Sequence, residues 1–170
     1  SIFEDLTVWS DSNIESLRRY FVDNPDEGKG TFIEKLERQL QGAGAGVKQL
    51  ASEMTWFMLL CPSNIGAENK RDTVRFIWSW SGRDFPKDAP YLSDAVLGGI
   101  GSAGTAFNTA RWRELAYFVR VVEAFRKLGK EQRAILLQDG WALAEWLDPL
   151  PDSGSRQLRH MLLYLLFPDI

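Results

Sequence analysis

Signals that start and stop helices recur along this chain, and they constrain its fold more than any other feature. Ser12 and Thr31 are each followed three positions later by glutamate, a pattern typical of a helix N-terminus. Glycine- and proline-rich breaks separate the helical segments, and no segment shows the alternation of a strand or the signal of a hairpin. The sequence therefore predicts an all-α fold, a compact bundle of about eight to nine helices.

The apolar spacing predicts where these helices lie along one domain that covers residues 1–170. We expect helices over 12–22, 31–41, 47–61, 69–79, 91–97, 109–128, 130–137, 141–147 and 155–167, with a loop over 81–90. The longest, from the N-cap Thr109 to Leu128, is the predicted central helix and ends at Gly129. Its inward-facing residues are expected to be Trp112, Leu115, Val119, Val122 and Phe125.

The side-chain inventory argues against an active site. Cys61 is the only cysteine and His160 the only histidine, so neither a Cys–His pair nor a zinc site of such ligands can be assembled. No phosphate-binding loop of the G-x-x-x-x-G-K-[ST] type occurs, and carboxylate pairs such as Glu34 and Glu37 fit helix caps and solvated faces. We expect no catalytic residue, metal or cofactor; an enzyme that uses carboxylates alone is the alternative left open.

Gly99, Gly101 and Gly104 match the dinucleotide-binding pattern G-x-G-x-x-G. The preceding residues are predicted to be helical, whereas that motif requires a strand before it and a surrounding βαβ unit. We therefore interpret the glycines as a tight connection between helices, where glycine provides positive φ angles.

A single cysteine cannot form an internal disulfide, and Cys61 lies in the apolar run 56–61, where a buried thiol packs like a small hydrophobic residue. No apolar run approaches the roughly 18 to 20 residues that span a bilayer, and no basic-then-apolar leader begins the chain. We expect a cytoplasmic protein with no membrane segment.

The middle of the chain is basic, although the whole chain has a net charge of −3. Residues 70–133 hold 12 Lys and Arg against 7 Asp and Glu. On the longest predicted helix Arg113, Arg120 and Lys127 recur every seven residues, which places them in one stripe that could follow a phosphate backbone. An ordinary solvated face, on which Glu123 and Lys127 pair, is the alternative.

A second basic cluster is followed by tryptophans, a mixture that binds nucleic acid by charge and stacking. Of these tryptophans, Trp78 is expected in the core and Trp80 on the surface. The residues predicted to contact nucleic acid are Lys70, Arg71, Arg75, Trp80, Arg111, Arg113, Arg120, Lys127 and Lys130.

Five places carry a resemblance to a known family: 31–40, Leu50 with Glu53, Leu59 to Pro62 with Lys70, Gly98 to Asn108, and 158–169. They resemble the helical N-terminal region of bacterial McrB-like AAA+ proteins, relatives of the GTP-driven motor of modified-cytosine restriction systems. The resemblance implies an appended N-terminal module with an AAA+ motor beyond Ile170 and a separate nuclease subunit. It implies target-DNA recognition in a restriction or phage-defence system. The chain itself lacks the motor's nucleotide-binding motifs, so no GTPase residue is assigned.

Two hypotheses of function follow from the sequence. The first is a non-catalytic module that recognises DNA through its basic middle region. The second is an interaction or assembly module that docks on the motor or on a partner protein. The acidic overall balance, with a pI near 5.3, and the apolar final helix favour the second hypothesis.

Overall fold

The computed structural model describes residues 2–99 and 110–169. Within these ranges it contains nine α-helices and, apart from isolated bridge residues at Ile2, Asp5 and Pro62, no β-structure. The helices are α1 (Asp11–Leu17), α2 (Phe32–Gln39), α3 (Ala45–Met58), α4 (Ala67–Ser79), α5 (Asp94–Leu97), α7 (Arg111–Arg126), α8 (Lys130–Gln138), α9 (Gly140–Leu147) and α10 (Gln157–Leu166). A π-helical turn, Arg18–Val22, continues α1, and 3-10 turns occupy Pro90–Leu92 and Ser153–Ser155. The all-α prediction is confirmed.

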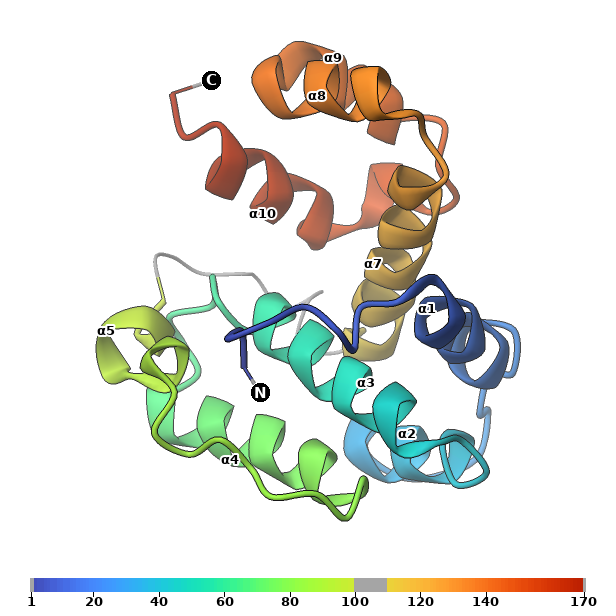
Figure 1. Ribbon diagram of the computed structural model, residues 1–170, viewed down its shortest axis with the longest axis vertical. Helices are drawn as coiled ribbons and strands as arrows, with labels where there is room; N and C mark the ends of the chain where they lie inside the picture. Colours follow the sequence, from blue (N-terminus) through green and yellow to red (C-terminus); the bar gives the residue numbers. More distant parts are fainter. Residues whose placement is uncertain (1, 100–109, 170) are drawn as a thin grey trace.

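Helix α7 connects two groups of helices (Figure 1). Helices α1 to α5 form one group, in which α3 packs against α1, α4 and α7. Helices α8, α9 and α10 form the other group, in which α9 contacts both α8 and α10 and α10 also contacts α7. One continuous core, which includes Leu50, Val119 and Leu158, runs through both groups. Helix α7 is the longest of the described helices, as the sequence predicted.

A second, smaller core lies between α3, α4 and α5. It includes Trp56, Val74, Trp78 and Leu97, all of them buried. The indole Nε1 of Trp78 donates to the backbone oxygen of Asp84 at 3.1 Å, which satisfies its only polar group. The prediction that Trp78 belongs to the core is confirmed.

The helix boundaries follow local chemistry, with two corrections. The Thr31 hydroxyl accepts a hydrogen bond from the Glu34 amide at 3.2 Å, so this predicted cap is confirmed. The predicted cap Ser12 is wrong, because Ser10 caps α1 by accepting from the Asn13 amide at 3.1 Å. Helix α3 ends at Met58, with Leu59 as its C-cap, rather than at residue 61. Thr109 lies outside the described residues.

The expected inward face of α7 is confirmed only in part. Leu115 and Val119 are fully buried. Val122 and Phe125 are half-buried and pack against the main core. Trp112 is 39% exposed and lies against the guanidinium of Arg113, so its predicted inward orientation is wrong. Trp112 lies in the first turn of α7, so no preceding turn of this helix covers its side chain.

A buried carboxylate joins α10 to α7. Glu114 accepts from the amides of Gln157 and Leu158, at 3.0 and 2.9 Å, and these amides begin α10. The buried guanidinium of Arg156 lies 3.7 Å from the same carboxylate. The side chain of the N-cap residue Arg156 makes no capping hydrogen bond, so Glu114 of α7 caps α10 instead.

Gly99 is held in a conformation that favours glycine. Its φ is +83°, and a Cβ built on it would lie 2.5 Å from the carbonyl oxygen of Pro62. The expectation of positive φ is thus confirmed at Gly99, whereas Gly101 and Gly104 lie outside the described residues. The chain around Pro62 has little freedom to move away, because Lys70 Nζ donates to the same oxygen at 2.5 Å.

We predict that Gly99→Ala lowers the free energy of unfolding by roughly 1–3 kcal/mol more than Gly82→Ala. Both glycines have positive φ, +83° and +72°, so both variants bear the same kind of backbone strain. Only Gly99 has atoms close enough to overlap with an added methyl group. Urea denaturation of the two variants measures the difference, and equal losses would show that the contact with Pro62 is unimportant.

Candidate functional site

The residues predicted to contact nucleic acid differ widely in exposure. Lys70 is fully buried, and burial lowers the pKa of its ammonium group. It donates to the Pro62 carbonyl at the connection between α3 and α4, so it is not on the surface, where a phosphate backbone could reach it. A buried lysine that bonds a backbone carbonyl has no signature in the sequence.

The other cations of the second cluster are held by neighbouring acidic or backbone groups. Arg71 donates to the carbonyl of Leu92 at 3.1 Å and pairs with Asp94 at 2.5 Å. Arg75 pairs with Asp72. Trp80, expected on the surface, is half-buried, and its ring packs edge-on against Phe76 at 5.7 Å.

The cationic stripe on α7 is partly neutralised. Arg120 lies 4.0 Å from Asp152, and Lys127 lies 3.9 Å from Glu123. Arg111 is half-buried, and burial lowers the pKa of its guanidinium. Arg113 and Lys130 are exposed and make no ion pair with the described part of the chain. Nucleic-acid contact by this stripe therefore depends on few uncompensated charges.

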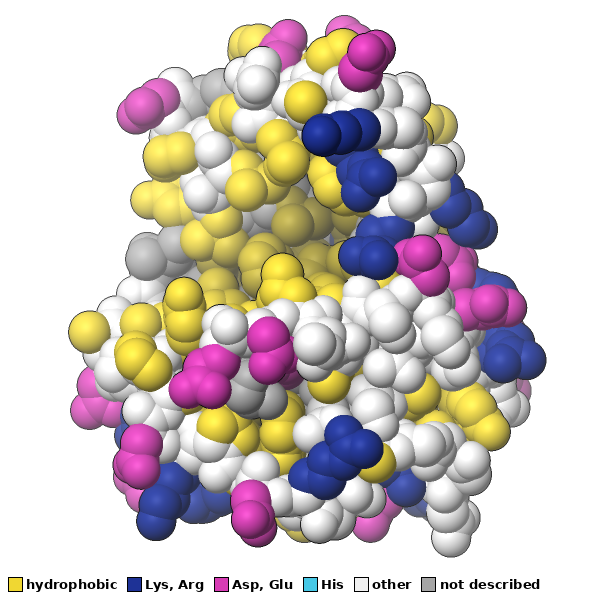
Figure 2. Space-filling model, in the orientation of Figure 1, with side chains coloured by type: hydrophobic (Ala, Val, Ile, Leu, Met, Phe, Trp, Pro, Cys, Tyr) yellow, Lys and Arg dark blue, Asp and Glu magenta, His cyan; other side chains and the backbone are white. Residues whose placement is uncertain are grey.

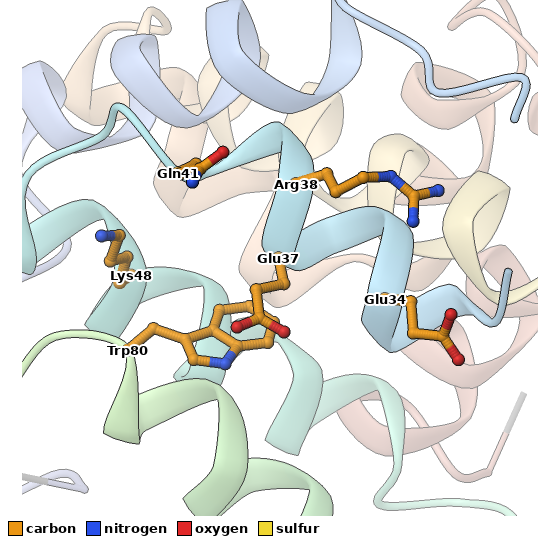
Figure 3. Close-up of a pocket in the computed structure, with 6 residues that line it drawn as sticks. All are labelled: Glu34, Glu37, Arg38, Gln41, Lys48 and Trp80. Atoms are coloured by element: carbon orange, nitrogen blue, oxygen red, sulfur yellow. The ribbon is translucent and has the colours of Figure 1, made fainter.

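A polar pocket of about 450 Å³ lies between α2, α3 and the end of α4. Its lining residues are Glu34, Glu37, Arg38, Gln41, Lys48 and Trp80. Figure 3 shows the carboxylate of Glu37 over the indole of Trp80, while Arg38 and Glu34 extend in another direction. Arg38 is committed to Asp26, with Nε 2.7 Å from the carboxylate. The pocket carries charges of both signs that do not converge on one position.

An apolar groove lies between the four helices α7, α8, α9 and α10, with a volume of about 160 Å³. Every described residue that lines it is hydrophobic. They include Phe118 and Val122 of α7, Leu137 of α8, Trp146 of α9, and Leu162 and Leu166 of α10. Figure 2 shows hydrophobic side chains gathered in a hollow across the middle of this face, with charged side chains around its edges.

Large exposed hydrophobic side chains are concentrated on the same helices. Ile135 and Leu137 of α8 are 58% and 52% exposed, and Trp141 of α9 is 71% exposed. Tyr164 and Leu166 of α10 are also exposed. Contiguous exposed apolar surface rimmed by polar residues marks binding sites in soluble proteins. The sequence analysis noted the apolar α10 but missed α8 and α9, although α9 is hydrophobic on nearly all sides.

A buried carboxylate that the sequence analysis also missed is connected to the groove through Trp9. Glu53 of α3 is fully buried, and its Oε2 accepts from the indole Nε1 of Trp9 at 2.9 Å. Its Oε1 has no hydrogen-bond partner among the described residues. Burial raises the pKa of Glu53 to about 7, against the smaller opposing effect of the Trp9 hydrogen bond. Trp9 packs edge-on against Phe118, which lines the groove.

The described residues contain no group of three or more His, Cys, Asp or Glu side chains placed to hold a metal ion. None of the helices in the described ranges combines the length and apolar character needed to cross a bilayer.

Comparisons with protein-family models, with curated proteins and with solved structures gave no match for this chain. No family is assigned. The resemblance to McrB-like proteins stays a prediction from the sequence, and the argument for function rests on the geometry of the site.

Proposed function

We propose that this domain is a non-catalytic protein-interaction module whose apolar groove binds an amphipathic helix of a partner protein. The observation that carries the proposal is the groove between α7, α8, α9 and α10, whose lining residues, within the described part of the chain, are all hydrophobic. Binding of a helix in such a groove is a recurrent mode of protein recognition, in which the partner inserts apolar side chains spaced one helical turn apart.

The size and chemistry of the groove favour a protein partner. Pockets that enclose small-molecule ligands usually measure about 300–1,000 Å³ and contain a few placed polar groups. This groove, at about 160 Å³, is smaller, and residues 2–99 and 110–169 contribute no polar side chain to its lining. It suits the anchoring side chains of a partner surface, and it offers no group for acid–base or nucleophilic chemistry.

The resemblance noted in the sequence suggests a setting for this activity. In a cytoplasmic McrB-like restriction or phage-defence system, the helix that binds the groove would belong to the AAA+ motor or to a partner subunit. That setting is part of the proposal.

DNA recognition is the second candidate, and one observation favours it. Arg113 lies 5.2 Å from the ring of Trp112, and both side chains are exposed at the start of α7. A guanidinium beside an indole could contact phosphate and base together. Binding of this kind would weaken steeply with salt. A gel-shift titration of duplex and single-stranded DNA against salt tests it, with Arg113→Gln as the variant expected to lose binding.

A pair of variants on α8 tests the groove. The probe is a synthetic, uncharged amphipathic helix with leucines at helical spacing and glutamine elsewhere, labelled for fluorescence anisotropy. We predict that Leu137→Glu weakens binding of this peptide by roughly tenfold or more, because a carboxylate in the apolar groove must be desolvated. Ile135→Glu should change binding less than twofold, because Ile135 is outside the groove.

Both side chains are more than half exposed, so both variants should keep the fold, which thermal unfolding verifies. Equal effects of the two variants would show that the peptide binds elsewhere. If the wild-type domain does not bind the peptide, the proposed function is wrong.

A further inference from the structure

We infer that the helix bound by the groove carries carboxylates at the end that meets the junction of α7 and α8. This inference rests on the proposed function and specifies the chemistry of the partner. It is based on the charges at that junction, on helical spacing along α8, and on where acidic residues lie on the surrounding helices.

The junction of α7 and α8 carries four cations, and two of them are uncompensated. Arg126 pairs with Asp11 at 2.6 Å, and Lys127 pairs with Glu123 at 3.9 Å. Lys130 and Arg133 make no ion pair within the described parts of the chain. The positive charges of these two residues can therefore pair with acidic groups of a ligand.

Helical spacing places both uncompensated cations beside the groove. Leu137 lines the groove, and Arg133 and Lys130 precede it on α8 by four and seven residues. Residues at these intervals share one side of a helix. Figure 2 shows Lys and Arg side chains along one edge of the hydrophobic area. A helix lying in the groove would bring its end, or the flank of its apolar stripe, against these side chains.

Arg133 has a buried hydrogen-bond donor without an acceptor among the described residues. It is half-buried, and its Nε is shielded from solvent with no hydrogen-bond partner among the described residues. A buried donor without an acceptor is unfavourable, and a carboxylate is the acceptor that guanidinium groups bind most strongly. An incoming Asp or Glu would supply it once the Arg133 side chain rotates to expose Nε.

Acidic side chains of the lining helices are paired elsewhere or lie on other sides of their helices. Glu131 of α8 is one residue from Lys130 and two from Arg133, so it does not share the side of the helix that carries these two cations. Glu123 of α7 is held by Arg18 at 2.9 Å. Glu145 of α9 is two residues from Leu143, which places it on the side of the helix away from the groove. Helix α10 contains no acidic residue. The groove side of these helices is thus cationic at one edge and apolar elsewhere, which is complementary to an acidic amphipathic helix.

Two matched peptides test the inference. Both carry the same leucine stripe, and one has two glutamates in its first turn where the other has two glutamines. We expect the glutamate peptide to bind wild-type protein roughly tenfold more tightly at low salt, with the ratio falling as salt increases. The ratio should fall to about one in the double variant Lys130→Gln/Arg133→Gln. It should persist in the control Lys29→Gln/Lys87→Gln, which removes two exposed cations elsewhere.

Each of the other possible binding results would contradict a different claim. If the two peptides bind wild-type protein equally, the groove is a docking site but the acidic partner is wrong. If the tenfold ratio survives in Lys130→Gln/Arg133→Gln, the carboxylates are recognised elsewhere and the inference is also wrong. If neither peptide binds, the proposed function fails. Binding of the glutamine peptide to the double variant verifies that the groove remains folded.

Discussion

Glu114→Ala is expected to lower the free energy of unfolding by roughly 3–5 kcal/mol, the cost typical of removing one partner from a buried ion pair. Glu114 is 1% exposed, and its carboxylate accepts from the two amides that begin α10. Alanine would leave these amides without their acceptor and the buried Arg156 guanidinium without its opposite charge. Urea denaturation followed by circular dichroism measures the loss.

Two comparisons isolate the capping role of Glu114. Glu114→Gln keeps a hydrogen-bond acceptor and should lose less stability than Glu114→Ala. Glu131→Ala removes an exposed glutamate from α8 and should change stability by less than about 0.5 kcal/mol. Because α10 forms one side of the groove, Glu114→Ala should also weaken the groove's peptide binding. A loss below about 1 kcal/mol in Glu114→Ala would contradict the assigned role.

The second large effect concerns pH. The pKa of Glu53 is about 7 in the folded protein, against 4.5 for an unperturbed glutamate. Between these two pH values the folded form therefore holds a proton that the unfolded form has released. Stability should therefore fall as the pH rises from about 4.5 to about 7 and stay level above that. The full effect of this shift is about 3 kcal/mol.

Glu53→Gln should abolish this dependence, because the amide oxygen can still accept from Trp9 and never ionises. We predict that the variant gains up to about 3 kcal/mol over wild-type protein between pH 4.5 and pH 8. Unfolding free energies at both pH values measure the change. The exposed Glu68→Gln variant is the control and should follow the wild-type curve. A wild-type curve that rises over this range would show that Glu53 ionises without penalty.

Much of the fold could be predicted from the sequence because helix ends are set by local chemistry. The Thr31 hydroxyl caps α2, and Gly129 separates α7 from α8. Local chemistry was not sufficient at α1. Ser10 and Ser12 could each cap the N-terminus of this helix, and the sequence does not distinguish between them.

The candidate site was harder to predict because it arises from packing between helices distant in the sequence. Val122 and Phe125 have the spacing of core residues, yet both line the open groove. Periodicity identifies the apolar side of a helix, but it does not show whether a neighbour covers that side. At Lys70 the sequence misled in the opposite direction. A lysine is normally exposed, but this one is buried and bonded to the Pro62 carbonyl.

Methyl NMR spectroscopy of the domain, titrated with the glutamate peptide, tests most directly whether the groove binds a helix. We predict that the largest shifts fall on the methyl groups of Leu137, Leu143, Leu162 and Leu166, which line the groove on α8, α9 and α10. The methyl groups of Leu36 and Leu50, in the other group of helices, should remain unshifted. Shifts confined to α2, α3 and α4, or no shifts at saturating peptide, would contradict the proposed function.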